Sequence, residues 1–94
     1  MENEKIVLPK QLLRSGTSIG ANINEAQDAQ SKNDFISKLS IALKEARESK
    51  YWIELLRETK FLSIKEAESL LEDLVEVIKL LVSIIKSAKK LKVN

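Results

Sequence analysis

The chain has 94 residues, of which 44% are hydrophobic and 4% aromatic, and its 16 basic and 14 acidic side chains give a net charge of +2. It has no cysteine and no histidine, which removes disulfides, thiolate nucleophiles, the commonest neutral-pH proton shuttle and the usual zinc ligands. We therefore expect one small domain that is not an enzyme and uses no metal, cofactor or small-molecule substrate. The mild charge does not by itself indicate nucleic-acid binding.

Two glycines and one proline leave little turn chemistry for β-hairpins, so the composition predicts an all-α fold with a core of Leu, Ile, Val and Ala. A membrane helix needs about twenty nearly uncharged residues, and no such stretch is present. A charged start followed by an apolar signal core is also absent. We expect a cytoplasmic protein with no membrane contact.

Residues 1–8 show no repeated apolar spacing, which predicts a tail before a first helix at about 9–28. Pro9 suits the first turn of that helix, where its missing N–H would be unpaired in any case. Gly16 and Gly20 interrupt the apolar stripe of this helix. Because glycine costs roughly 1 kcal/mol relative to alanine inside a helix, the pair indicates a face that another backbone approaches closely. The stripe itself consists of Leu8, Leu12, Ile19 and Ile23.

A second helix is predicted at about 32–60, with Ser31 as its N-cap and Asp34 three positions on. Apolar and small residues then recur at alternating steps of four and three, as expected for a buried helix face. These positions are Phe35, Leu39, Ala42, Ala46, Ser49, Ile53 and Leu56.

A third helix is predicted at about 64–90, opened by a capping box of Ser63 and Glu66. Its apolar residues cover more than half of the helix circumference, which exceeds what a monomer of three helices needs to bury. The width of this band predicts homo-oligomerisation. The residues predicted to form helix-packing and oligomer contacts are Gly16, Gly20, Ile19, Ile23, Trp52, Leu74, Ile78, Leu81 and Ile85.

Glu45, Glu48 and Glu54 could in principle form a carboxylate metal site between helices. No histidine accompanies them, so charges on a solvated helix face, paired with Lys44 or Lys50, explain them better. Tyr51 and Trp52 could form a stacking platform for bases, yet adjacent helix positions point about 100° apart. We expect one of the two rings in the core and the other at its rim.

Polar side chains accompany the glycine face of the first helix, and we weigh two interpretations of them. They form a recognition surface, or Asn22 and Glu25 hydrogen-bond to Arg47, Tyr51 or Trp52 on the next helix and fix its register. We favour the second interpretation. The polar residues are Arg14, Asn22, Asn24 and Glu25.

The end of the third helix carries the concentrated basic patch of the chain, formed by Lys86, Lys89, Lys90 and Lys92. Repeated around an oligomer, these lysines could contact phosphates. Complementarity with the helix dipole explains them equally well.

Several segments together resemble the four helix bundle family of 23S rRNA-intervening-sequence proteins. They are 11–26 (QLLRSGTSIGANINEA), 31–35 (SKNDF), 41–46 (IALKEA) and 51–56 (YWIELL). The resemblance extends over about residues 8–90. It implies an antiparallel up-down helical bundle, here with the family's first helix missing or reduced to a short tail, which leaves three long helices.

The resemblance further implies a ring-like homopentamer without enzymatic activity. It also includes the accessory variability protein of retroelements, a basic pentamer that partners a reverse transcriptase and its RNA. We therefore predict a homo-oligomeric helical scaffold whose partner is RNA or a reverse-transcriptase-like protein. The alternative is a purely structural protein–protein interaction module without affinity for nucleic acid.

Overall fold

The computed structural model describes residues 2–91, with side chains from residue 7 onward. It contains helices α1 (Glu2–Gln27), α2 (Lys32–Glu58) and α3 (Ile64–Lys90), and no strand occurs in this part of the chain. The all-α fold with three long helices is thus confirmed. Within residues 2–91, no helix is long and apolar enough to cross a membrane.

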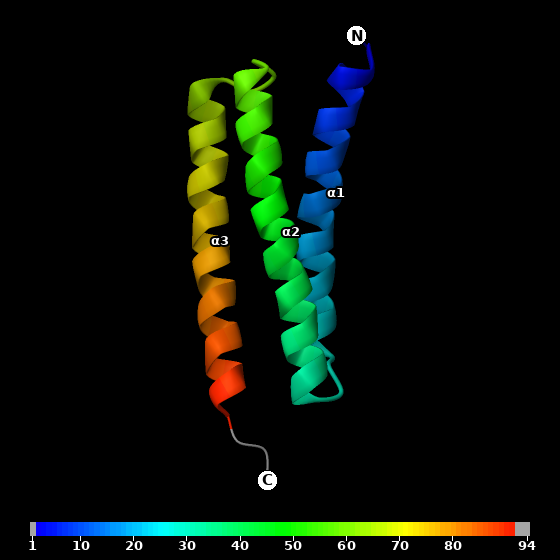
Figure 1. Cartoon of the computed structure of the whole chain (residues 1–94), viewed down its shortest axis with the longest axis vertical. Coiled ribbons are helices and arrows are strands. Elements are labelled where there is room, and N and C mark those ends of the chain that lie inside the picture. Colours follow the sequence, from blue (N-terminus) through cyan, green and yellow to red (C-terminus); the bar gives the residue numbers. More distant parts are fainter. Residues whose placement is uncertain (1, 92–94) are drawn as a thin grey trace.

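The three helices run antiparallel in one layer, with α2 between the other two (Figure 1). The layer measures 56 × 22 × 14 Å. Both α1 and α3 pack on α2, but no Cα atom of α1 lies within 8 Å of a Cα atom of α3 in the described chain. A closed bundle would bring the outer helices together. The layer is therefore open between α1 and α3 on one of its faces.

Helix α1 begins at Glu2, so the predicted tail was wrong over residues 2–8. Pro9 lies inside the helix and not in its first turn. It removes one N–H donor and crowds the carbonyl four residues earlier, yet Glu2, Glu4 and Lys5 are good helix formers and the helix continues through them. The prediction failed because so short a segment cannot display a 3.6-residue period.

The predicted start of α2 is confirmed, since the Ser31 side chain accepts a hydrogen bond of 3.0 Å from the Asp34 N–H. The predicted buried stripe is also confirmed along almost its whole length, and Phe35 is half-buried. Three of its members are alanine or serine, so the neighbouring helices can approach α2 closely. The buried positions of α2 are Leu39, Ala42, Ala46, Ser49, Ile53 and Leu56.

The turn between α2 and α3 fixes the relative position of these helices. Lys60 adopts a left-handed conformation (φ 66°), and the Phe61 N–H returns 2.9 Å to the Leu56 carbonyl, as in a Schellman motif. The predicted capping box is present, because Ser63 and Glu66 bond each other's backbone N–H. These hydrogen bonds hold the pKa of the Glu66 carboxyl below its ordinary value of 4.5.

Two clusters of buried side chains form the core along α2. One contains Ala26, Leu39, Ala42, Leu81 and Ile85, and Ile23 packs against it. The other contains Ala46, Ile53, Ala67 and Leu74, with Ile19, Leu62 and Ile78 packed against it. The second cluster lies where α1 and α3 leave the layer open, and several of its side chains, Ile53 and Leu74 among them, line a groove between these two helices.

Candidate functional site

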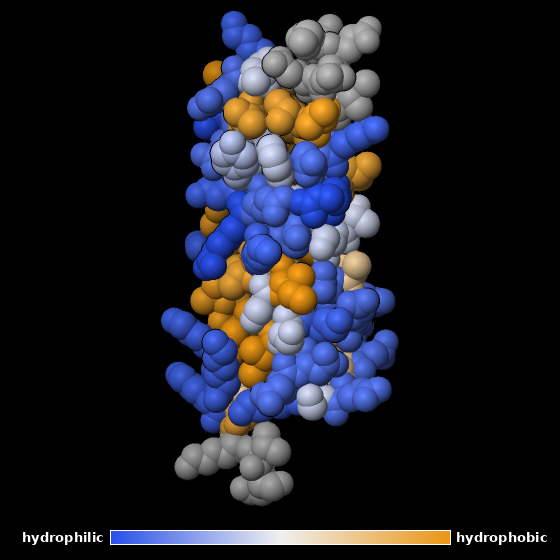
Figure 2. Space-filling view, turned by 45° about the vertical axis from the view of Figure 1, so that its right-hand side comes forward, coloured by the Kyte–Doolittle hydropathy of each residue, from blue (hydrophilic) through white to orange (hydrophobic). Residues whose placement is uncertain are grey.

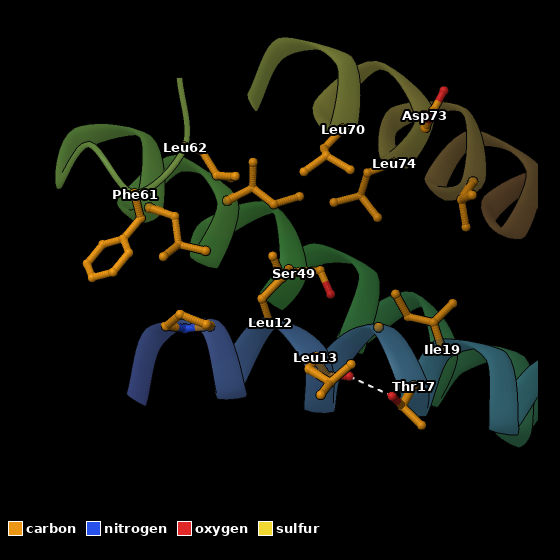
Figure 3. Close-up of a pocket in the computed structure, with 15 residues that line it drawn as sticks. Leu12, Leu13, Thr17, Ile19, Ser49, Phe61, Leu62, Leu70, Asp73 and Leu74 are labelled. Atoms are coloured by element: carbon orange, nitrogen blue, oxygen red, sulfur yellow. Dashed lines mark hydrogen bonds between the residues drawn. The ribbon is translucent and has the colours of Figure 1, made fainter. Parts of the chain in front are cut away.

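An apolar groove of about 740 Å³ runs between α1 and α3, with α2 as its floor. In Figure 3, Leu62, Leu70 and Leu74 point into this space from one side, and Leu12 and Ile19 line it from α1. Asp73 turns away at its edge (Figure 3). We call this space the apolar groove. Its lining on α1 also includes Leu13, whose exposed fraction of 71% is high for a leucine.

Ser49 supplies a polar atom in the floor of the apolar groove (Figure 3). The residue is 2% exposed, yet its Oγ has no hydrogen-bond partner in the described chain. A buried hydroxyl without a partner is costly and is normally paired. A molecule in the groove that donates to or accepts from Ser49 would satisfy this atom.

The two glycines of α1 face open space. A Cβ built on Gly16 or Gly20 would meet no atom of the described chain within 4 Å. The close backbone approach that we predicted at these glycines is therefore not made within the chain. Gly16 lines the apolar groove, so room for a close approach exists on the open side of α1.

The structure divides the predicted packing and oligomer residues into three groups. Gly16, Ile19 and Leu74 line the apolar groove. A second group packs inside the chain and comprises Ile23, Ile78, Leu81 and Ile85. Gly20 is exposed on α1 and Trp52 is half-buried on α2. The predicted set therefore mixes groove residues with intrachain core residues.

A polar network joins α1 to α2 and was missed in the sequence. Arg14 forms ion pairs with Glu45, at 3.4 Å between Nη1 and Oε2, and with Glu48. Glu48 also accepts a hydrogen bond of 3.2 Å from the Trp52 indole N–H. Ser15, fully buried, donates to the Gln11 carbonyl at 3.0 Å. The ion pairs of Arg14 thus join α1 to α2 beside the buried Ser15, where the two helices pack.

These contacts correct one sequence interpretation. Glu45 and Glu48 pair with Arg14 on another helix and not with Lys44 of their own helix. Within the described residues, no group of three or more acidic side chains is placed to hold a metal ion. The sequence missed the pairing because it depends on the register of α1 against α2, which spacing along one helix does not define.

The remaining polar residues of α1 behave differently from the prediction. Asn22 bonds within its own helix, donating to the Ser18 carbonyl at 2.8 Å, so its predicted bond across helices was wrong. Glu25 does reach across, but to Lys38 at 3.3 Å. Of the two residues expected to bond across helices, only Glu25 does so. Its partner is Lys38, and not Arg47, Tyr51 or Trp52.

The surface seen when α1 is turned forward carries a hydrophilic band across its middle, with apolar areas above and below it (Figure 2).

At the C-terminal end of α3, Lys86, Lys89 and Lys90 are exposed, and none forms a salt bridge within the described residues. Lys92 lies outside the described residues. The end of α3 therefore presents to solvent three positive charges that have no partner among the described residues.

The model of a family described as "23S rRNA-intervening sequence protein" matches residues 1–83. The chain is also similar to a solved structure from Bacteroides thetaiotaomicron VPI-5482, described as a protein with unknown function from the S23 ribosomal protein family. The two are 58% identical, with a TM-score of 0.86 over 90% of this chain and 79% of that chain. No curated protein matches the sequence.

Proposed function

This chain belongs to the 23S rRNA-intervening sequence protein family, and from that premise we propose that it is a non-enzymatic, homo-oligomeric helical scaffold that binds RNA. A nucleic-acid-processing protein, such as a reverse transcriptase, would then be held through the shared RNA. The family, which we expected from the residues of 11–56, is confirmed. Assembly and RNA binding are the proposal.

The observation that carries the proposal is the apolar groove. Two of its lining leucines, Leu13 and Leu70, are 71% and 41% exposed, although each Å² of apolar surface removed from water contributes about 25 cal/mol. The whole face of the layer that contains the groove measures 56 by 22 Å, roughly 1,200 Å², so it has room for the roughly 800 Å² per partner of a standard stable interface around the groove. Covering the groove with a second subunit would bury Leu13, fill the space above Gly16 and give Ser49 Oγ a partner. The homopentamer that the family resemblance implies is one such assembly.

The RNA part of the proposal rests on Lys86, Lys89 and Lys90, to which Lys92 adds a fourth charge in the sequence. One such patch binds phosphate weakly, but an oligomer repeats it in every subunit and the patches act together. The name of the family refers to 23S rRNA, and the solved neighbour is described as a member of a ribosomal protein family. Both names favour RNA as the partner.

The test is the salt dependence of RNA binding by the wild type and by a variant with Lys86, Lys89, Lys90 and Lys92 changed to Gln. Each phosphate contact adds roughly 0.7–0.9 to the slope of log affinity against log salt. We expect the variant to flatten this slope while helicity and oligomeric mass stay the same. Lys65→Gln, an exposed lysine at the start of α3, is the matched control and should change the slope little.

The second candidate function is a purely structural interaction module. The dipole of α3 favours lysines at its C-terminus whether or not RNA binds. A wild type that forms oligomers yet retains no single- or double-stranded RNA at about 50 mM salt, where charge contacts are least screened, would favour this alternative.

A further inference from the structure

A hollow of about 470 Å³ lies between α2 and α3 and is separate from the apolar groove. Its lining on α2 includes Tyr51, which is two residues from both Ser49 and Ile53 of the groove floor. Two helical positions correspond to about 200° around the axis, so the hollow opens on the opposite face of the layer. We call it the Tyr51 hollow. Its lining residues are Arg47, Lys50, Tyr51, Glu54, Val75, Ile78 and Lys79.

The Tyr51 ring is exposed to solvent and packs against the ring of Trp52. The residue is 58% exposed, and its ring meets the Trp52 ring at 5.0 Å between centroids with 67° between the planes. Trp52 is itself held by the hydrogen bond from its indole N–H to Glu48. This support restricts the Tyr51 side chain, so a flat partner that stacks on it loses less conformational entropy.

The charged side chains that line the Tyr51 hollow are mostly positive. Arg47, Lys50 and Lys79 contribute three cations against one carboxylate, that of Glu54. No salt bridge occupies any of the four within the described residues. The cations are therefore free to attract an anion, while Val75 and Ile78 supply an apolar base to the hollow.

We propose that the Tyr51 hollow binds a nucleotide unit of single-stranded RNA, with the base stacked on Tyr51 and the flanking phosphates held by Arg47, Lys50 and Lys79. An aromatic face between cations matches the alternation of base and phosphate along a strand. The base must be unpaired, because paired bases are stacked inside the duplex. This inference rests on the proposed RNA binding and adds to it a site on α2 that is distinct from the lysines at the end of α3.

The experiment uses a labelled ten-residue oligoadenylate and follows both its affinity and the emission of Trp52, the one tryptophan of the chain. We expect Tyr51→Ser to weaken binding roughly tenfold, since stacking on one base is commonly of this size. Tyr51→Phe keeps the ring and should stay within about twofold of the wild type. Binding should also change Trp52 emission, because that ring lies against Tyr51.

The salt dependence of RNA affinity distinguishes base stacking from contacts between cations and phosphates. Stacking releases no counterions, so Tyr51→Ser should keep the wild-type slope of log affinity against log salt, whereas Lys79→Gln should lower it by roughly 0.7. Lys65→Gln lies outside the hollow and serves as the charge control. A double-stranded RNA of the same length should leave Trp52 emission unchanged.

Two results would exclude stacking on Tyr51 alone, and a third would also overturn the proposed function. Equal affinities for the wild type and a helical, oligomeric Tyr51→Ser would exclude stacking on Tyr51 and leave the lysine-mediated RNA binding intact. An equal loss in Tyr51→Phe and Tyr51→Ser would also exclude it, since the ring would then not be the contact. A wild type that binds no RNA at about 50 mM salt would overturn both this inference and the proposed function.

Discussion

The two faces of this three-helix layer differ in chemistry although they share the central helix. The face with the apolar groove presents leucines, two glycines and an unpaired Ser49 hydroxyl. The opposite face presents an exposed tyrosine among Arg47, Lys50 and Lys79. An open layer, unlike a closed bundle, can assign one face to assembly and keep the other for a charged partner. The predictions below test this division, beginning with the largest expected effect.

Leu13→Glu should dissociate the proposed oligomer. The substitution places a charge on the lip of the apolar groove, and burying an unpaired charge at an interface costs several kcal/mol. We expect at least roughly 100-fold weaker assembly by light scattering, with helicity unchanged because Leu13 is exposed in the single chain. Leu80→Glu changes a similarly exposed leucine that does not line the groove and should keep the oligomer. Equal masses for both variants would contradict this role of the groove.

Arg14→Ala should destabilise the fold and leave the groove intact. It would leave Glu45 and Glu48 without their cation, and hydrogen bonds to charged groups contribute about 1.5–3 kcal/mol each. Because Arg14 is half exposed, we expect a loss of about 1–2 kcal/mol in urea unfolding at matched protein concentration. Lys10→Ala, on the exposed surface of α1, is the control. An unchanged unfolding midpoint in Arg14→Ala would show that the network contributes nothing to stability.

Much of the layer could be predicted from the sequence, because caps and helical spacing are local signals. Ser31 and Ser63 mark the starts of α2 and α3 correctly, and the seven-residue spacing from Leu39 to Ile53 identifies the buried face of α2. Contacts between helices were harder to predict. The pairing of Arg14 with Glu48 and the separation of α1 from α3 depend on register and tilt, which no single segment encodes.

The candidate site was predicted in part for the same reason. Gly16 and Gly20 indicated an approachable face, because glycine in a helix is costly without a packing reason. The Tyr51 hollow combines residues of two helices, so spacing along α2 alone argued against a stacking platform. Residues 2–8 were wrongly predicted to be a tail, since a segment of two turns shows no clear period.

Gly16→Ala and Gly20→Ala should each raise the stability of the single chain and weaken assembly of the proposed oligomer. Neither Cβ meets an atom within 4 Å, so each alanine should stabilise the dissociated chain by up to about 1 kcal/mol. If another backbone approaches these positions, assembly should weaken roughly tenfold. Ala21→Gly, on the same helix, should lower chain stability and leave assembly unchanged. Alanine variants that assemble as tightly as the wild type would remove the glycines from the interface.

Glu66 belongs to neither face and gives the smallest expected effect. Its pKa is depressed by its bonds with Ser63. A depressed carboxyl pKa contributes stability that is present above the unfolded-state pKa and lost as pH falls through the folded-state value. Glu66→Gln should therefore be slightly less stable than the wild type at pH 7, and the difference should shrink as pH falls below the ordinary pKa of 4.5 and be lost once pH passes the lower folded-state value. A difference that persists in acid would assign the effect to something other than this charge.

The mass of the protein in solution, measured with and without single-stranded RNA, tests the division of the two faces most directly. One chain has a mass of 10.6 kDa. We predict a fixed multiple of this mass without RNA and the same protein multiple plus RNA when RNA is added, because the two partners use opposite faces. A chain that stays at 10.6 kDa at micromolar concentration, or an oligomer that RNA dissociates, would contradict the account.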